Sequence, residues 1–207
     1  MLSYKKEAKM RPQLALSKLK PLIKQGYFTS KEARDSGVHP ATINHYIKTG
    51  HLKRINRGVY QGSDYQNPSA FRWEDLIEAA HSVKGGVVCL ISALAVYDLT
   101  EEIPRQHWIA IKHSTSTKPS KKLKVVRYRN LQLGREKMEL EGTKISIFNR
   151  ERTIIDAFRL LSIETAIKAL KAALQVRGKN RIDLVKLQEY AQKLRFDITP
   201  YLMSFTT

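Results

Sequence analysis

The fold is decided at residues 26–60, which read GYFTSKEARDSGVHPATINHYIKTGHLKRINRGVY. Residues 29–32 form a capping-box pattern, in which a threonine and a glutamate three residues later satisfy the free amides at a helix start. The pattern predicts a short helix that stops at Gly37. A second helix is expected to open at Pro40, because proline suits a first helical turn, and to end at Gly50.

Three positions in these helices have the residue types that a helix-turn-helix needs. Ala33 is small, which lets the two helices cross closely, and Gly37 accepts the positive φ of a tight turn. Ile43 provides an apolar anchor that faces the first helix. The other residues expected in this small core are Val38, Tyr46 and Ile47. An ordinary helical hairpin is the alternative interpretation.

A β-hairpin is expected after the second helix. Leu52–Ile55 and Val59–Tyr60 alternate in polarity around the turn Asn56–Gly58, a pattern typical of a hairpin. A further helix is predicted before the motif, over residues 13–24, with a kink or a start at Pro21. Together these elements predict a winged helix-turn-helix, whose second helix enters the DNA major groove.

The outward face of the second helix has side chains suited to reading bases. At 100° per residue it presents Asn44, His45 and Lys48, opposite the apolar residues. Asn44 can pair with adenine, whereas His45 and Lys48 can donate to guanine. The residues expected to contact phosphates are Thr42, Lys53, Arg54 and Arg57. At the tip of the wing, Arg57 is alternatively expected to enter a minor groove. Ordinary solvated side chains remain the alternative for the whole set.

Charge supports a nucleic-acid partner. The 207 residues contain 37 Lys and Arg against 19 Asp and Glu, a net charge of +18. Residues 1–65 hold 13 basic and 4 acidic residues, so +9 of that charge lies in less than a third of the chain. Such a field attracts phosphate backbones or anionic membranes. The alternative is a surface that serves solubility only.

The rest of the chain predicts a second domain and an α+β fold. Residues 61–70 are polar with Gly, Asn and Pro, so they are interpreted as a linker between domains at 1–66 and 67–207. Strands are expected at 87–90, 108–111, 123–128, 137–140 and 144–148. Helices are expected at 73–82, at 93–98 after a Ser92 cap, and throughout the chain from Asn149.

Two late helices show an apolar spacing of three and four residues, which predicts a buried face on each. The residues expected on these faces are Ile163, Ile167, Leu170 and Leu174 in the first helix, and Leu184, Leu187, Ala191 and Leu194 in the second.

The sequence lacks the patterns that common enzymes need. Glu141 and Lys144 are three residues apart, not the two of a Glu-x-Lys nuclease motif. The metalloprotease, deaminase, phosphate-loop and nucleophile-elbow motifs are also missing. Cys89 lies in an apolar run and is interpreted as a core residue. We therefore expect no catalysis, no metal and no cofactor. The N-terminus has no signal-peptide pattern and the longest apolar run is too short for a bilayer, so a cytoplasmic protein is expected.

Two further features of the second domain are candidates for a structural or functional role. Arg152 and Asp156 are four residues apart, where an ion pair forms readily, and a structural pair is preferred to a functional one. Residues 112–129 contain cations and no acid. The residues considered there for toxin neutralisation or phosphate contact are Lys118, Lys121, Lys122, Lys124 and Arg127. A solvated loop is the alternative.

The stretch at 26–60 resembles the N-terminal winged helix of the AbiEi-type antitoxins of abortive-infection, type IV toxin–antitoxin systems. Three later stretches resemble the same family, namely GGVVCLISALAVYDLT at 85–100, HWIAIK at 107–112 and SIFNRERTIIDAFRL at 146–160. The resemblance runs from about residue 14 to 195.

The resemblance implies two activities. The N-terminal domain would repress its own operon by binding promoter repeats. The C-terminal domain would counteract a nucleotidyltransferase-like toxin, without a stable complex. Two other functions stay open from the residues alone: a ligand-responsive winged-helix transcription factor with no toxin partner, and a DNA-binding nuclease component. A protein that acts on RNA is disfavoured, because stacking aromatics are not grouped.

Overall fold

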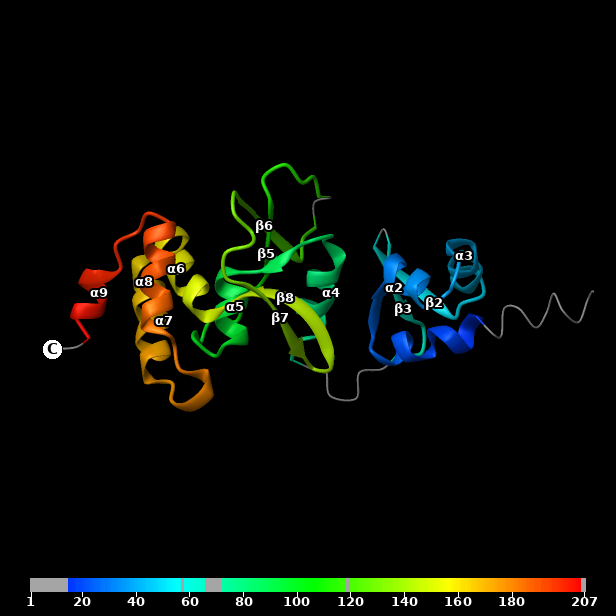
Figure 1. Ribbon diagram of the computed structural model, residues 1–207, viewed down its shortest axis with the longest axis horizontal. Coiled ribbons are helices and arrows are strands. Elements are labelled where there is room, and N and C mark those ends of the chain that lie inside the picture. The colour runs from blue at the N-terminus through cyan, green and yellow to red at the C-terminus, as the bar shows by residue number, and fades with distance from the viewer. Residues whose placement is uncertain (1–14, 57, 66–71, 118–119, 206–207) are drawn as a thin grey trace, which may run out of the picture. The chain divides into compact units, whose positions relative to one another are not determined.

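The computed structural model describes residues 15–56, 58–65, 72–117 and 120–205 (Figure 1). The chain divides into two compact units. The first comprises residues 1–82 and 139–144, and the second residues 83–138 and 145–207. The domain boundary predicted after residue 66 stays a prediction, because residues 66–71 lie outside the described ranges.

The first unit is built around three strands and three short helical segments. Residues 15–24 are helical and precede the following elements: β1 (Tyr27–Thr29), α2 (Ser30–Asp35), α3 (Pro40–Lys48), β2 (Leu52–Asn56) and β3 (Val59–Gly62). The strands form an antiparallel sheet in the order β1-β3-β2. This is the predicted helix-turn-helix followed by its wing.

The hydrogen bonds at the start of α2 and the turn at its end are those that the sequence predicts. The amide of Glu32 donates to Oγ1 of Thr29 at 3.2 Å, and the amide of Thr29 donates to Oε2 of Glu32 at 2.6 Å. These two bonds form the predicted capping box. Gly37 has a φ of +76°, in the left-handed region that favours glycine at the turn between α2 and α3.

One core joins the helix at 15–24, the helices α2 and α3 and the three strands of the first unit. Its buried residues are Leu19, Phe28, Ala33, Val38, Ile43, Tyr46, Leu52 and Tyr60, and Ile47 packs against them half-buried. The helix at 15–24 passes through Pro21 as one helical run, so the expected start at that proline is wrong. The wing also ends later than predicted, because Gln61 and Gly62 continue β3 into the expected linker.

A fourth helix, α4 (Glu74–Ser82), also belongs to the first unit. The ring of His81 on α4 stacks on that of Tyr27 on β1, with centroids 4.7 Å apart. The helix was predicted at 73–82, but as part of the second domain.

A mixed sheet of five strands, in the order β6-β5-β4-β8-β7, belongs to the second unit except for residues 139–144 at its β7–β8 hairpin. The strands are β4 (Val87–Val88), β5 (His107–Lys112), β6 (Leu123–Tyr128), β7 (Arg135–Leu140) and β8 (Thr143–Phe148). Strand β4 pairs antiparallel with β5 and parallel with β8, and β5 pairs parallel with β6. The α+β fold class is thereby established.

Helices accompany this sheet. They are α5 (Leu90–Val96), α6 (Arg150–Leu160), α7 (Ile163–Gln175), α8 (Leu184–Lys193) and α9 (Thr199–Met203), with a 3₁₀ turn, η1 (Gly178–Asn180). Figure 1 shows α6, α7 and α8 packed side by side. The described helices are all too short or too polar to cross a bilayer.

Two expectations for the second unit are wrong. The strand predicted at 87–90 ends at Val88, and Leu90 begins α5, so Ser92 lies within that helix and does not cap it. Oγ of Ser92 instead accepts a hydrogen bond from the amide of Trp108 at 2.8 Å.

The buried face of α7 also differs from the prediction. It consists of Ala166, Ala169, Leu170 and Ala173. Ile163 and Ile167 are exposed, as is Leu184 on α8. Alanines face inward because small side chains let α7 approach α6 closely.

Candidate nucleic-acid interface

One face of α3 is buried and the opposite face is open. Ile43 and Tyr46 belong to the core of the first unit. Asn44, His45 and Lys48 are exposed, and Thr42 is half-buried beside them. Helix α3 contains no acidic residue. The predicted base-reading residues Asn44, His45 and Lys48 therefore share one solvent-facing surface with Thr42, which was predicted to contact phosphate. We call this surface the reading face (Thr42, Asn44, His45 and Lys48).

The first turn of α3 is fixed by two residues. Pro40 occupies the start of the helix, and Nδ1 of His39 accepts a hydrogen bond from the amide of Ala41 at 3.2 Å. This bond needs an unprotonated Nδ1. The cap satisfies one of the free amides at the positive end of the helix dipole. Sequence analysis did not identify His39 as a cap.

The wing provides further exposed cations. Lys53 and Arg54 are both exposed on β2, which contacts α3. Successive strand residues point to opposite faces of a sheet, so these two side chains diverge. Arg57 lies outside the described residues. The structure thus places Lys53 and Arg54 as exposed neighbours on one strand, with their side chains on opposite faces of the sheet.

The wing is tied to the helix-turn-helix by Ser30. Its amide donates to the carbonyl of Gly58 at 2.9 Å, and its hydroxyl lies 3.4 Å from that of Tyr60. Gly58 has a φ of +78°, as the hairpin turn requires. Strand β1, which the sequence did not predict, supports this link by pairing Thr29 with Val59.

A basic residue that sequence analysis missed lies beside the turn of the motif. A Cβ built on Gly37 would be 3.5 Å from Nζ of Lys18. Lys18 thus projects from the helix at 15–24 to the junction of α2 and α3. Its position in a basic run with Lys20 and Lys24 was the only signal in the sequence.

In the second unit, the residues of the basic run at 112–129 differ in their contacts. Lys121, Lys122 and Lys124 are exposed, whereas Lys118 lies outside the described residues. NH1 of Arg127 donates to the carbonyls of His113 and Thr115, at 2.9 and 2.8 Å. Arg127 therefore helps to hold the loop between β5 and β6.

The ion pair between Arg152 and Asp156 is present and buried. Nε of Arg152 lies 2.7 Å from Oδ2 of Asp156, with the two side chains 1% and 0% exposed. Arg159 adds a second contact to the same carboxylate at 3.0 Å. Burial raises the pKa of Asp156, and the two guanidinium groups oppose that rise. An external ligand has no access to this pair.

Cys89 is buried, as predicted, and burial raises the pKa of its thiol well above the ordinary value. A protonated, shielded thiol is a poor nucleophile and a poor metal ligand. Among the described residues, no three His, Cys, Asp or Glu side chains are grouped closely enough to hold a metal ion.

Comparison with known proteins agrees with the geometry of the first unit. Residues 17–61 match the family model described as "Transcriptional regulator, AbiEi antitoxin". No curated protein matches the chain. The matched residues run from the helix at 15–24 through α2 and α3 into the wing, which covers the reading face. Residues 17–61 are therefore similar to the AbiEi antitoxin family of transcriptional regulators.

Proposed function

We propose that this protein is a DNA-binding autorepressor of its own operon and the antitoxin of a type IV toxin–antitoxin system. The observation that carries the proposal is the exposed reading face of α3, which combines an amide, an imidazole and an ammonium group with no acid. These groups match the hydrogen-bonding edges of bases in the major groove.

The two units divide this function. The first unit binds promoter repeats, with Asn44, His45 and Lys48 on base edges and Thr42, Lys53, Arg54 and Arg57 on phosphates. The second unit counteracts a nucleotidyltransferase-like toxin without forming a stable complex with it. The exposed cations Lys121, Lys122 and Lys124 support a role for the second unit that depends on charge. Both activities take place in the cytoplasm.

The fold indicates where the DNA-binding domain ends. A cut after residue 66 would remove α4, whose His81 stacks on Tyr27. We propose that the DNA-binding domain extends to Ser82, because α4 belongs to the first unit.

Operator binding is tested with the full chain. Its affinity for the DNA upstream of its own gene is measured by fluorescence anisotropy at ~150 mM salt, against a scrambled duplex of equal length. Specific sites usually bind about 10³-fold or more tightly than random DNA. Equal affinity for both duplexes would contradict specific repression.

Toxin neutralisation is tested by co-expression. A nucleotidyltransferase-like reading frame adjacent to this gene is induced with and without the antitoxin. We expect growth to be restored only when the antitoxin is present. If growth stays arrested while this protein accumulates in folded form, the antitoxin role is excluded for that pair.

A further inference from the structure

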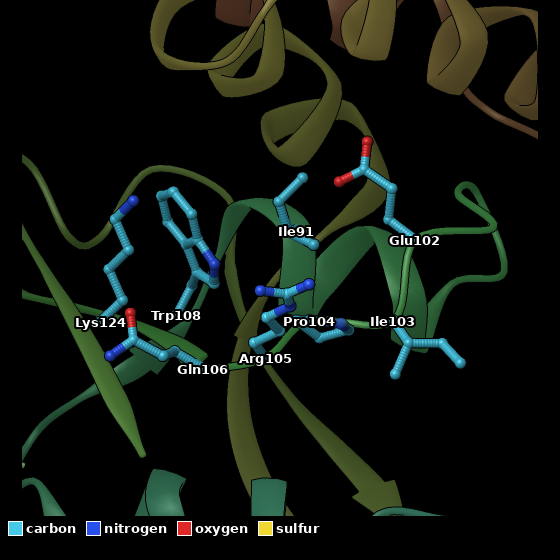
Figure 2. A pocket seen from close by; sticks show the side chains of 8 residues that line it. All are labelled: Ile91, Glu102, Ile103, Pro104, Arg105, Gln106, Trp108 and Lys124. Carbon is cyan, nitrogen blue, oxygen red and sulfur yellow. The ribbon is translucent and has the colours of Figure 1, made fainter. Parts of the chain in front are cut away.

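A surface depression in the second unit is lined by residues that the proposed function does not use. Its volume is about 390 Å³. The lining comes from α5, β5 and β6 and from the segment that joins α5 to β5 (Figure 2). The lining residues are Ile91, Glu102, Ile103, Pro104, Arg105, Gln106, Trp108 and Lys124.

The centre of the depression is an accessible indole ring. Trp108 is half-buried on β5, and Nζ of Lys124 lies 3.8 Å from the centroid of its ring. Figure 2 shows the indole between Lys124 and Ile91, with Pro104 on the Ile91 side. A planar group can therefore stack on the face of Trp108 opposite Lys124, against an aliphatic wall.

Two cations flank this ring. Figure 2 shows Lys124 on one side of the indole and the guanidinium of Arg105 on the other side, below Ile91. Arg105 and Lys124 are exposed, and no carboxylate in the described part of the chain pairs with either. Nε2 of Gln106 donates to the carbonyl of Lys121 at 3.0 Å, which holds the backbone of a third basic residue close by. Guanidinium and ammonium groups of this kind bind phosphate through charge-assisted hydrogen bonds.

A carboxylate lies at the end of the depression away from Lys124. Figure 2 shows Glu102 on the far side of Trp108 from Lys124. Oε1 of Glu102 accepts a hydrogen bond from Oγ1 of Thr165 at 3.2 Å, which restricts the carboxylate to this end. A ligand that fits the depression thus combines anionic groups for the two cations, a planar part for the indole and N–H donors for Glu102.

We infer that this depression binds a nucleotide, with its base stacked on Trp108 and its phosphates held by the flanking cations Arg105 and Lys124. Glu102 accepts from the N–H groups at the edge of the base. A simple polyanion does not match this polarity, because it would leave the indole uncovered and would face Glu102. The site is separate from the reading face, since all its residues belong to the second unit.

Intrinsic fluorescence tests the inference directly, because the chain has only two tryptophans, Trp73 and Trp108. In a Trp73→Phe variant of the full chain, emission reports on Trp108 alone. Titration with ATP, GTP and UTP is expected to quench that emission saturably, with the purines binding more tightly because they stack over a larger area. Absence of saturable quenching up to millimolar nucleotide would overturn the inference.

Matched charge variants assign the phosphate contacts. In the Trp73→Phe background, Arg105→Gln and Lys124→Gln are each expected to weaken nucleotide binding by about tenfold, whereas Lys171→Gln on α7 leaves it unchanged. Equal weakening in all three variants would show that net charge alone attracts the nucleotide. Circular dichroism verifies that each variant is folded.

Two probes separate stacking from charge. Tripolyphosphate has the anionic end without a base, so it is expected to quench Trp108 far less than ATP. Equal quenching by both would show that the site binds polyanions and does not recognise a base. Trp108→Ala is expected to weaken ATP binding, measured by calorimetry, by about 5- to 150-fold, the range for losing one stacked base. If Trp108→Ala is unfolded, Trp108→Phe replaces it, and unchanged binding there is expected because a phenyl ring still stacks.

The source of the nucleotide is decided by a further comparison. If single-stranded octanucleotides bind the depression much more tightly than ATP, its natural ligand is an unpaired nucleotide within a strand. Equal or weaker binding of the octanucleotide assigns the site to a free nucleotide. An Asn44→Ala change on the reading face is expected to leave either result unchanged, because it lies in the first unit.

Discussion

Nε of Arg152 lies 2.7 Å from Oδ2 of Asp156, and neither side chain is accessible to solvent. NH1 of Arg152 also donates to the carbonyl of Leu133 at 3.0 Å, and NH2 lies 3.5 Å from that of Asn130. One guanidinium group thus joins α6 to the loop between β6 and β7.

Removing this guanidinium is expected to destabilise the second unit. Arg152→Met leaves the buried carboxylate of Asp156 with the partly exposed Arg159 as its paired cation, and breaking a buried pair typically costs about 3–5 kcal/mol. The change is measured as the free energy of unfolding in urea. Lys168→Gln serves as the control, because its partner Glu164 is as exposed as Lys168 itself. A fully stable Arg152→Met protein that no longer protects against the toxin would assign the pair a functional role instead.

Substitutions in the first unit are expected to separate base reading from phosphate contact. Asn44→Ala or Lys48→Ala removes a base contact, which should cost about 1–3 kcal/mol on the operator and relax its sequence preference. Lys53→Ala should weaken binding to all duplexes alike and lower the salt slope by about 1. Anisotropy titrations on operator and scrambled DNA measure both. Identical behaviour of Asn44→Ala and Lys53→Ala would refute the proposed docking of α3.

The exposed lysines of the second unit are expected to serve neutralisation rather than operator binding. A Lys121→Gln, Lys122→Gln double variant keeps the loop polar and removes two charges. We expect its operator affinity to persist while a co-expressed toxin becomes lethal. A fall in operator affinity with a flatter salt dependence would instead place the loop on DNA. Full protection and full repression would leave these lysines as solvated residues.

Tyr27 predicts how the first unit responds to alkaline pH. Burial, with Glu78 and Glu74 nearby, raises the pKa of Tyr27 to about 12. The folded state therefore holds the phenol proton more tightly than the unfolded chain, whose phenol has the ordinary value of 10.0. This stabilisation is complete below pH 10 and is lost as pH rises towards 12. The free energy of unfolding of wild type should fall relative to that of Tyr27→Phe over that interval. Phenolate absorbance near pH 10 for all the tyrosines would contradict it.

The first unit could be predicted in detail because its signals are local. A capping box, a glycine turn and an alternating hairpin each lie within a few neighbouring residues. Strand β1 was missed because three residues, Tyr27–Thr29, are too few to show an alternation. Its strand conformation depends on pairing with β3, which is remote in sequence.

The second unit was less predictable because its contacts are between distant elements. The apolar run at 87–97 reads equally well as a strand or a buried helix. Leu90 enters α5 with a φ of +48°, a conformation that no local pattern indicates. On α7, large aliphatic side chains mark the expected core, yet alanines occupy it.

The two candidate sites differ in the same way in how far the sequence predicts them. The exposed side of α3 could be projected from helical geometry alone. The contact of Lys124 with Trp108 could not, because it depends on the parallel register that places Lys124 opposite Trp108 across β5 and β6. Sequence separation hides such pairs until the strand order is known.

The hydrogen bond from the amide of Ser30 to the carbonyl of Gly58 has a kinetic consequence for DNA recognition. It fastens the turn of the wing hairpin to the first residue of α2, so the wing is ordered before DNA is met. The entropy of ordering the hairpin is then lost during folding and not at each encounter. Contacts from α3 and from the wing should therefore form in one step, and association with the operator should follow a single exponential.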